Sequence, residues 1–450
     1  MPKKQLTIEE KMNNALVPEE EWPYKLPDNW CWVRGSMILR RMESQKPAGE
    51  YFQYIDIESV DNSRQEVIAP KLLPVSKAPS RASRKLHIGD TLFSLVRPYL
   101  MNIAYIDDSL AKCIASTGFY VCSPNKNMEP RYLYWLMVSP FTVDGLNNYM
   151  KGDNSPSIRG SDIENYAFPL PPLPEQQRIV SRIESLFVKL DEAKEKVQNV
   201  IDGADTRKAA ILHQAFTGKL TAKWRKENGV SDDSWEEVTI KSLCNSLKYG
   251  TAKKSAKEGK VPVLRMGNLQ NGEIDWTSLV YSNDSDDIRK YSLQNEDVLF
   301  NRTNSAELVG KTSIYRGQQP AIYAGYLIKL DYKRDRILGD YLNYVLNSPS
   351  AKEYCNAVKT DGVNQSNINA QKIGAFGVRL PKLSEQKEIV RRLDNLLNKE
   401  KSICKSCEVS LAAIEAMKKA ILAKAFRGEL GTNNPVEESS KELLREIISI

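Results

Sequence analysis

The string nearest to a nucleotide-binding motif lies between Ser305 and Thr312, which read SAELVGKT. Its last residues resemble the end of a phosphate-binding loop, but the first glycine of that loop is missing. The residues that follow it, SIYRG, favour a strand rather than a helix, so no helix N-terminus is offered to a phosphate. The pattern therefore predicts that this string binds no nucleotide.

Residues able to carry acid–base or metal chemistry are few. The chain has two histidines, His87 and His213, which is too little material for a histidine metal site or a Ser/His/Asp triad. Cys404 and Cys407 are spaced like a pair of zinc ligands, but they fall in mid-helix and no second pair accompanies them. The sequence contains no Asn/Asp-Pro-Pro-aromatic tetrapeptide of an adenine methyltransferase and no nuclease carboxylate cluster followed by Glu-x-Lys. These observations favour a binding or scaffolding component over an enzyme.

Basic residues gather in two places. Lys253 and Lys254 belong to a group of five lysines between positions 248 and 260, and four basic residues lie between positions 77 and 85. Such groups suit contacts with phosphates, which give a nucleic-acid-binding protein salt-dependent affinity. Solvated surface is the alternative for both groups.

Side chains able to read bases occur in two pairs of matching loops. Arginine, asparagine and glutamine carry donors and acceptors that match base edges in the grooves of DNA. One pair comprises residues 97–99 and 301–304, and the other comprises residues 154–159 and 364–367. The candidates for DNA contact are Arg97, Tyr99, Asn154, Arg159, Arg302, Asn304, Asn364, Gln365 and Asn367, together with Lys253 and Lys254.

The elements that position these loops come from a tandem duplication. LPPLPEQQRIVSRIESL, which starts at Leu170, recurs as LPKLSEQKEIVRRLDNL from Leu380, 210 positions later. AAILHQAFTGKL, ending at Leu220, recurs with the same offset as KAILAKAFRGEL, ending at Leu430. The offset drifts slightly further upstream, as loops of different length would cause. The period of about 210 residues indicates a duplicated domain and not a solenoid.

The well-matched part of each copy is predicted to be one long helix. Its apolar residues step by three and four, which is the pattern of a coiled-coil seam. Prolines precede both helices, and Gly218 and Gly428 fit their C-terminal ends. The first helix, from Glu175 to Phe216, would be a rod of roughly 60 Å. The expected seam residues are Ile179, Ile183, Leu186, Leu190, Ile389, Leu393, Leu396 and Ile403.

The simplest partner for each long helix is the other one. Antiparallel pairing would place the two globular parts at opposite ends, and packing of each helix on its own domain is the alternative. The globular parts, residues 26–170 and 231–380, hold short strand-like runs such as DTLFSLV and AIYAGYLIKL with helical stretches after them. The predicted fold is therefore α+β: two tandem globular domains, separated by two long helices that pair as an antiparallel coiled coil, with a pseudo-twofold internal duplication.

The predicted division of the chain has six parts. These are an N-terminal arm (1–25), a first domain (26–170), a central helix (171–222), a second domain (223–380), a distal helix (381–430) and a tail (431–450). The tail contains SSKELLREIIS, an amphipathic helix expected to pack beside the N-terminal arm.

Composition sets the class of the 450-residue chain. Hydrophobic residues make up 41% and charged residues 27%, and the net charge of +7 permits an acidic partner such as DNA without requiring one. No apolar run approaches the roughly 18 residues of a spanning helix. The charged start is unlike a secretory signal, and seven cysteines, an odd number, point to reduced thiols. We expect a cytoplasmic protein without a membrane partner.

These features together resemble the specificity subunit of type I restriction-modification systems, over essentially the whole chain. The resemblance rests on the duplicated helix starts PLPPLPEQQRIV and RLPKLSEQKEIV and on the helix ends AFTGKL and AFRGEL. The segments ALVPEEEWPYKLPDNWCWVRG and GDTLFSLVRPYL also resemble the family. The second copy departs from the latter as EDVLFNRTNSAEL, which suits two domains that read different sequences.

The resemblance implies a non-catalytic role in reading double-stranded DNA. Each globular part would be a target recognition domain for one half of an asymmetric bipartite site. The helices would set the spacer and dock two modification (methyltransferase) subunits, which restriction subunits with translocase activity then join. No cofactor or metal is expected in this chain, and S-adenosylmethionine, ATP and Mg²⁺ are expected in the partner subunits. A lone DNA methyltransferase or nuclease with diverged motifs, and a coiled-coil scaffold without DNA contact, are the alternatives.

Overall fold

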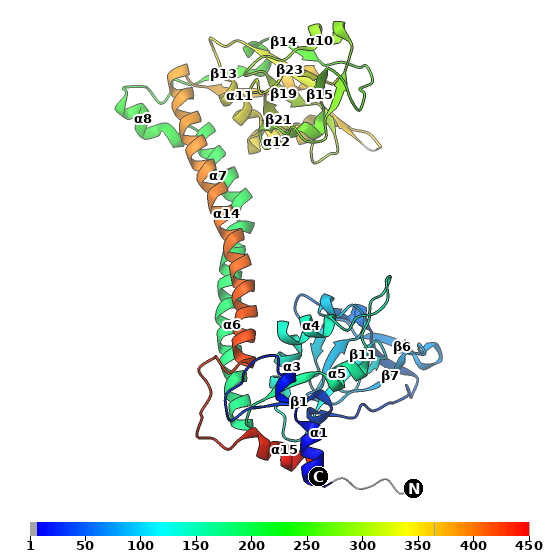
Figure 1. Cartoon of the computed structure of the whole chain (residues 1–450). Coiled ribbons are helices and arrows are strands. Elements are labelled where there is room, and N and C mark those ends of the chain that lie inside the picture. The colour runs from blue at the N-terminus through cyan, green and yellow to red at the C-terminus, as the bar shows by residue number, and fades with distance from the viewer. Residues whose placement is uncertain (1–6, 364, 450) are drawn as a thin grey trace. The chain divides into compact units, whose positions relative to one another are not determined.

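The computed structural model describes residues 7–363 and 365–449 (Figure 1). It divides into two compact units, of which unit 1 is Met1–Val197 with Val409–Ile450 and unit 2 is Gln198–Glu408. The divisions fall inside the long helices and not at the predicted boundaries after residues 170 and 380. The reason is that each globular part packs against portions of both long helices, as its core shows.

Unit 1 contains two four-stranded sheets and several short helices. Its strands are β1 (Cys31–Arg34), β2 (Leu39–Arg40), β3 (Tyr51–Ile55), β4 (Val60–Asp61), β5 (Glu66–Val67), β6 (Lys71–Pro74), β7 (Ala82–Lys85), β8 (Thr91–Ser94), β9 (Ile103–Tyr105), β10 (Ile114–Ser116), β11 (Phe119–Pro124) and β12 (Ala167–Leu170). Its shorter helices are α1 (Ile8–Ala15), α2 (Gly35–Ile38), α3 (Pro130–Val138), α4 (Pro140–Asn147), α5 (Gly160–Asn165) and α15 (Ser440–Ser449). The sheet orders are β6-β3-β10-β7 and β2-β11-β8-β9, and β1 pairs with β12.

Unit 2 repeats this plan with a larger sheet. Its strands are β13 (Glu236–Thr239), β14 (Cys244–Tyr249), β15 (Val261–Leu264), β16 (Leu269–Gln270), β17 (Glu273–Ile274), β18 (Val280–Ser282), β19 (Val298–Asn301), β20 (Thr303–Asn304), β21 (Thr312–Ile314), β22 (Ile322–Tyr323), β23 (Leu327–Tyr332), β24 (Thr360–Asp361), β25 (Ser366–Asn367) and β26 (Gly377–Leu380). Its shorter helices are α8 (Ala222–Glu227), α9 (Ile240–Leu243), α10 (Ser285–Tyr291), α11 (Gly339–Leu346), α12 (Pro349–Val358) and α13 (Ala370–Gly374). The six-stranded order is β14-β23-β19-β21-β17-β16, and smaller sheets are β18-β15-β22, β20-β25-β24 and β13-β26.

The strand-like runs of the sequence form the buried strands. β8 pairs antiparallel with β11, and Phe93 lies opposite Tyr120 in the core of unit 1. The run AIYAGYLIKL is not one strand but two, β22 and β23, which belong to different sheets. A turn closed by the hydrogen bond from the Leu327 amide to the Ala324 carbonyl (2.9 Å) separates them, with Gly325 at its centre. The string at Ser305–Thr312 leads into strand β21, as its sequence predicted.

The long helices are α6 (Leu173–Asp202), α7 (Ala204–Phe216) and α14 (Leu383–Phe426). The predicted single helix from Glu175 to Phe216 is therefore interrupted at Gly203. The interruption is slight, because the Gly203 amide still donates to the Asn199 carbonyl (3.1 Å) and the Arg207 amide to the Gly203 carbonyl (3.0 Å). Gly218 and Gly428 follow the helix ends with positive φ of 80° and 72°, a conformation that glycine adopts without steric cost.

The long helices pair antiparallel within each unit. In unit 1, Lys194 on α6 contacts Glu415 on α14 (2.7 Å), while Ile183 shares a core cluster with Leu422 nearer the C-terminal end of α14. In unit 2, Arg207 on α7 contacts Glu400 (2.9 Å), and Leu212 and Leu393 lie in one cluster. In both units, residues further along α6 or α7 contact residues earlier along α14, which is the arrangement of an antiparallel helix pair.

The seam residues differ in how deeply they pack. Ile179, Ile183, Ile389 and Leu393 are fully buried, because the start of each helix packs on its own globular part as well as on the other helix. The middle positions Leu186, Leu190 and Leu396 are half-buried. Ile403 is 44% exposed, so its assignment to the seam is wrong. The neighbouring Cys404 and Cys407 are the less exposed residues there, so at this turn Cys404 takes the packed position that was predicted for Ile403.

The repeated Glu-Gln pair explains why both helices start alike. The Gln176 side chain accepts from the Glu129 amide (2.9 Å) and donates to the Pro171 carbonyl, and Gln386 makes the same contacts with Leu338 and Pro381. This pairing ties each helix start to the domain beside it.

Each buried glutamate meets the segment that follows the other helix copy. Thr432 donates to Glu175 (2.6 Å) in unit 1, and Thr221 donates to Glu385 (2.7 Å) in unit 2. Burial raises the pKa of Glu175, and the Thr432 hydroxyl and Arg178 oppose this shift. The tail completes unit 1, where α15 packs beside α1 with Leu444 buried, as the sequence predicted (Figure 1).

Candidate nucleic-acid interface

In unit 1 the loop after β8 meets the loop before α5. The Arg97 amide donates to the Pro156 carbonyl (2.8 Å), and the Arg97 guanidinium donates to the Asn154 carbonyl (2.7 Å). The structure therefore brings together two candidates from different loops. Arg97 has a positive φ of 48°, a conformation that costs a non-glycine residue about 1–3 kcal/mol and is common where loops present side chains for function.

The tip of the first loop is a short turn, Pro98–Leu100. Tyr99 on this turn is 47% exposed, and its neighbour Leu100 is also exposed. Arg159 is exposed as well and lines a recess of about 200 Å³ with Lys151 and Asp162. The four candidates of unit 1 thus lie on the surface, with cationic side chains close to exposed apolar ones, an arrangement that suits contact with both phosphates and bases.

Unit 2 builds the same pair of loops. β20 pairs with β25, so that Thr303 lies opposite Asn367 and Asn304 opposite Ser366. The Ile368 amide donates to the Arg302 carbonyl (2.8 Å), just as the Ile158 amide donates to the Leu95 carbonyl (2.9 Å) in unit 1. This register makes Arg302 the equivalent of Leu95, and Asn304 the equivalent of Arg97. The two units therefore present different side chains from one backbone arrangement.

Arg302 is held on several sides. Its guanidinium lies over the Tyr249 ring, 4.8 Å from the centroid, and donates to the Asn367 side chain (3.2 Å) and to the Gly325 carbonyl (3.4 Å). Asn367 in turn donates to the Thr303 hydroxyl (2.8 Å), so the orientation of its amide is set. The buried Nε of Arg302 has no hydrogen-bond partner within the described residues. Arg302 and Asn367 thus brace the loop pair.

The remaining candidates of unit 2 differ in their surroundings. Gln365 is exposed, and Asn304 accepts a hydrogen bond from the Ser305 amide (2.9 Å). Lys253 pairs with Asp284 (2.6 Å) and Asp287 (3.5 Å), and the hydrogen bond to Asp284 raises the pKa of Lys253. Lys254 is exposed, and no ion pair joins it to another residue of the described ranges. Asn364 lies outside the described residues.

Comparison with known proteins identifies the family of the chain. Residues 41–202 and 232–405 match the family model described as type I restriction modification DNA specificity domain, and these two segments make up more than half of the chain. The chain belongs to the type I restriction-modification DNA specificity family. The family and the role of DNA specificity subunit, both expected from the sequence, are therefore confirmed.

Members of this family resemble the chain along nearly its whole length. It is 29% identical over 423 residues to the EcoKI specificity subunit of Escherichia coli K12, and 27% identical over 421 residues to the StySPI specificity subunit of Salmonella potsdam, with 90% of each chain covered in both cases. The HsdS subunit from Thermoanaerobacter tengcongensis has a TM-score of 0.65 at 26% identity, over 91% of this chain and 99% of that one. A chain from a structural study of type I R-M complex assembly and conformational transition has a TM-score of 0.72 at 26% identity, over 90% and 100%.

The specificity subunit's loops also contain residues that the sequence did not indicate. Tyr249 carries the Arg302 guanidinium, and Gly325 supplies a carbonyl to it. Tyr249 precedes the loop at 360–367 by more than 100 positions and Gly325 precedes it by 35, so neither is a neighbour in sequence of the loop that it helps to hold. An aromatic residue before a glycine at a strand end was the one available signal for Tyr249.

Two further properties concern residues 7–363 and 365–449. No group of three His, Cys, Asp or Glu side chains in these ranges could hold a metal ion. No helix within them is both long and apolar enough to cross a membrane.

Proposed function

We propose that this specificity subunit reads an asymmetric, bipartite site in double-stranded DNA, with residues 26–170 reading one half and residues 231–380 the other. The observation that carries this proposal is the loop pair built twice with different side chains. Leu95 and Arg97 stand in unit 1 where Arg302 and Asn304 stand in unit 2. One scaffold with two sets of side chains suits an asymmetric site, because base edges are discriminated by the donors and acceptors presented to them.

The long helices set the spacer and dock two modification subunits in this proposal. Helix α14 is continuous over 44 residues, and the ion pairs of α6 and α7 with it hold the antiparallel register in each unit. Exposed apolar side chains occur on these helices, at Val188, Val409 and Met417 in unit 1 and at Ile403 in unit 2. Apolar groups kept at the surface of a helix pair suit contact with another protein.

Catalysis belongs to the partner subunits in this proposal. The chain contributes no catalytic group and binds no cofactor, while the modification subunits hold S-adenosylmethionine and methylate adenine. Restriction subunits with ATP- and Mg²⁺-dependent activity complete the cytoplasmic complex. The scarcity of histidine and the membership of a DNA specificity family support this division.

The test is co-expression with the neighbouring modification subunit and genome-wide mapping of methylated adenines, with and without the chain. We expect a bipartite motif that requires the chain and changes in one half when residues 231–380 are exchanged for those of a relative. Methylation unaffected by omission of the chain, or methylation by the purified chain alone, would contradict the proposal.

A further inference from the structure

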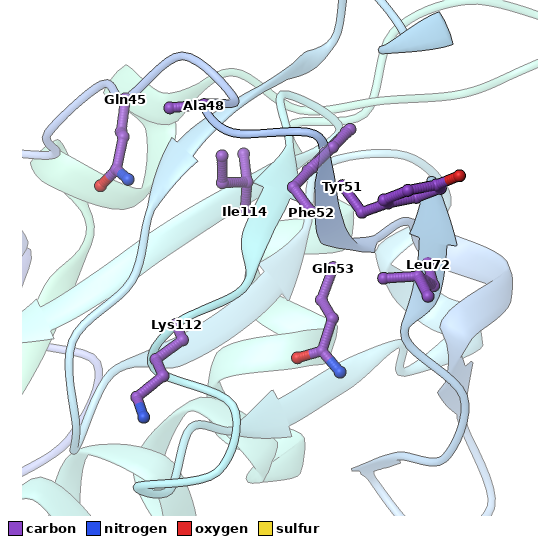
Figure 2. A pocket seen from close by; sticks show the side chains of 8 residues that line it. All are labelled: Gln45, Ala48, Tyr51, Phe52, Gln53, Leu72, Lys112 and Ile114. Carbon is purple, nitrogen blue, oxygen red and sulfur yellow. The ribbon is translucent and has the colours of Figure 1, made fainter. Parts of the chain in front are cut away.

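A second concave surface of unit 1 is lined by residues of strands β3, β6 and β10 and of the segments that precede β3 and β10 (Figure 2). The recess has a volume of about 340 Å³ and is lined by Gln45, Ala48, Tyr51, Phe52, Gln53, Leu72, Lys112 and Ile114. Lys112 is the one charged residue among them, so the lining carries a positive charge and no carboxylate. An anionic partner therefore fits this recess better than a cationic one.

The polar groups of the recess are available to a ligand. Gln45 and Gln53 are both exposed, and no hydrogen bond occupies the Gln45 side chain within the described part of the chain. Gln53 accepts a weak contact from the Cys113 thiol (3.5 Å), which leaves its NH₂ group free among the same residues. A glutamine side chain that keeps a donor and an acceptor can pair with the edge of a base in the major groove.

Apolar groups flank these carboxamides. Leu72 on β6 lies opposite Gln53 and is 67% exposed, and Tyr51 is 55% exposed on the same strand as Gln53. In Figure 2 the Tyr51 ring lies next to Leu72, while the Gln53 and Lys112 side chains extend to the same side. Apolar side chains beside carboxamides match the mixture of methyl and polar groups that A·T pairs show in the major groove.

The recess is connected to the loop pair through a chain of backbone contacts. The Leu95 amide donates to the Gly118 carbonyl (2.9 Å), and the Thr117 amide donates to the Arg81 carbonyl (2.9 Å). The Gln45 amide donates to the Ser83 carbonyl (3.0 Å) on β7, the strand that follows Arg81. The exposed Arg81 therefore lies between the two surfaces, where a cation suits the phosphates of one DNA segment that spans both.

The strands of unit 2 that correspond to this surface carry different residues. Its β15–β22 pair corresponds to β3–β10, since both are parallel, and in that register Pro262 stands where unit 1 has Gln53. The loop before β15 also pairs with β18 through Ala256 and Tyr281, at the edge that β6 leaves open in unit 1. Gln53 is thus not repeated at the matching position of unit 2, which suits an asymmetric recognition site.

We propose that Gln45 and Gln53 are specificity-determining residues that read base edges of double-stranded DNA, and that Lys112 contacts a phosphate beside them. This inference rests on the proposed function and adds a second contact surface to the half-site read by unit 1. It leaves the half-site read by unit 2 unchanged.

The experiment uses the complex of the chain with its modification subunits. Methylation motifs and binding to a randomised DNA pool are measured for wild type, Gln45→Ala, Gln53→Ala and Lys112→Ala. Gln319→Ala, which removes an exposed carboxamide from unit 2, is the matched control. Thermal unfolding of each variant identifies loss of fold, and two separate glutamine variants keep the test informative if one of them is unstable.

We expect each glutamine variant to lower discrimination at one or two positions of a single half-site by about 10-fold or more. Lys112→Ala should weaken binding to all sequences alike and reduce the slope of log affinity against log salt by about one. Unchanged motif and affinity in both glutamine variants would overturn the inference while the proposed function stands. Loss of the modification subunit from a variant complex would also overturn it, because the recess would then bind protein. A wild-type complex with no bipartite motif would overturn the proposed function and this inference with it.

Discussion

At the scale of single residues, Arg302 acts as a brace for the loop pair of unit 2. Its guanidinium joins the Tyr249 ring, the Asn367 side chain and the Gly325 carbonyl, which come from three separate segments. The sequence indicated Arg302 as a reader of bases because arginine is suited to guanine edges. The structure adds a positioning role, since the same group orients the amide of Asn367.

Substitution of Arg302 should affect one half-site only. We expect Arg302→Ala to relax discrimination in the half read by unit 2 by about 1–3 kcal/mol and to leave the other half unchanged. Arg302→Lys should restore little, because lysine lacks the planar fork that stacks on Tyr249 and reaches two acceptors. The methylation motif of each variant complex is the measurement, and equal loss in both half-sites would contradict the prediction.

Lys253 and Lys254 of unit 2 should differ in how much each contributes to the affinity for DNA. Lys253 is compensated by Asp284, whereas Lys254 is exposed and makes no ion pair within the described residues. We expect Lys254→Ala to weaken binding to every sequence alike and to lower the salt slope by about one. Lys253→Ala should have the smaller effect, because its charge is already neutralised nearby. Affinities measured over a range of salt would contradict this if the two variants behaved alike.

At the scale of elements, the start of α14 is fixed by charge as well as by packing. Glu388 accepts from Arg391 (2.7 and 2.8 Å) and from Arg392 (2.6 Å), and Arg392 donates to the Leu220 carbonyl (2.6 Å) beyond the end of α7. The hydrogen bonds from Arg391, with that from Arg392, lower the pKa of Glu388 from 4.5 to about 2. The ionised carboxylate therefore stabilises the junction between the two helix copies in unit 2.

The pH dependence of stability follows from the sign of this shift. Because the folded pKa is lowered, the contribution is present above pH 4.5 and is lost as the pH falls towards 2. We expect Glu388→Gln to lower the free energy of unfolding at neutral pH by about 1 kcal/mol, given the exposure of Arg391. The variant should also lose less stability than wild type as the pH falls from 4.5 towards 2, because it lacks the carboxylate that takes up a proton there. Glu408→Gln on the same helix is the control, since Glu408 makes no ion pair within the described residues. An equal loss of unfolding free energy in wild type and Glu388→Gln as the pH falls from 4.5 towards 2 would contradict the prediction.

Element boundaries show where sequence patterns succeed and where they fail. Helix ends at Gly218 and Gly428 were predictable, because a positive φ favours glycine whatever the surroundings. The interruption at Gly203 and the exposure of Ile403 were not predictable in this way. A heptad pattern tolerates a shift of one residue when few apolar residues line the helix face, so spacing alone does not fix which side chains are buried. Packing of the two helix copies decided which side chains turn inward.

At the scale of the whole molecule, the duplication gives each unit one globular part and portions of both long helices. The buried Glu175 accepts a hydrogen bond from Thr432, and the buried Glu385 accepts one from Thr221. In each unit, the segment that follows one long helix therefore contacts the start of the other long helix. Under the proposed function, helix length then sets the distance between the two DNA half-sites.

An insertion tests the helices as a spacer. Four residues added after Asn199 extend the helix by about 6 Å, roughly two base pairs. They make slightly more than one helical turn, so side chains beyond the insertion nearly keep their direction. We expect a changed preferred spacer with both half-sites still recognised, measured by methylation of a library of spacer lengths. The same insertion after Gly229, a turn residue with no neighbour within 4 Å of an added Cβ, should leave the spacer unchanged. An unchanged spacer in the Asn199 variant would contradict a spacer role for the helices.

The sequence by itself determined the duplication, the α+β class, the two long helices and the family, and it favoured the antiparallel pairing that the structure then showed. These features can be inferred from the spacing of residues along the chain. An amphipathic helix needs apolar residues at a regular interval, and a duplicated unit repeats its motifs at a fixed offset. Only the tertiary structure decided that Arg97 meets Asn154, that Tyr249 lies beneath Arg302, and that Gln45 and Gln53 share one recess. Such contacts join residues from separate strands and loops, and the choice of partner depends on loop closure and side-chain packing, which no local pattern encodes.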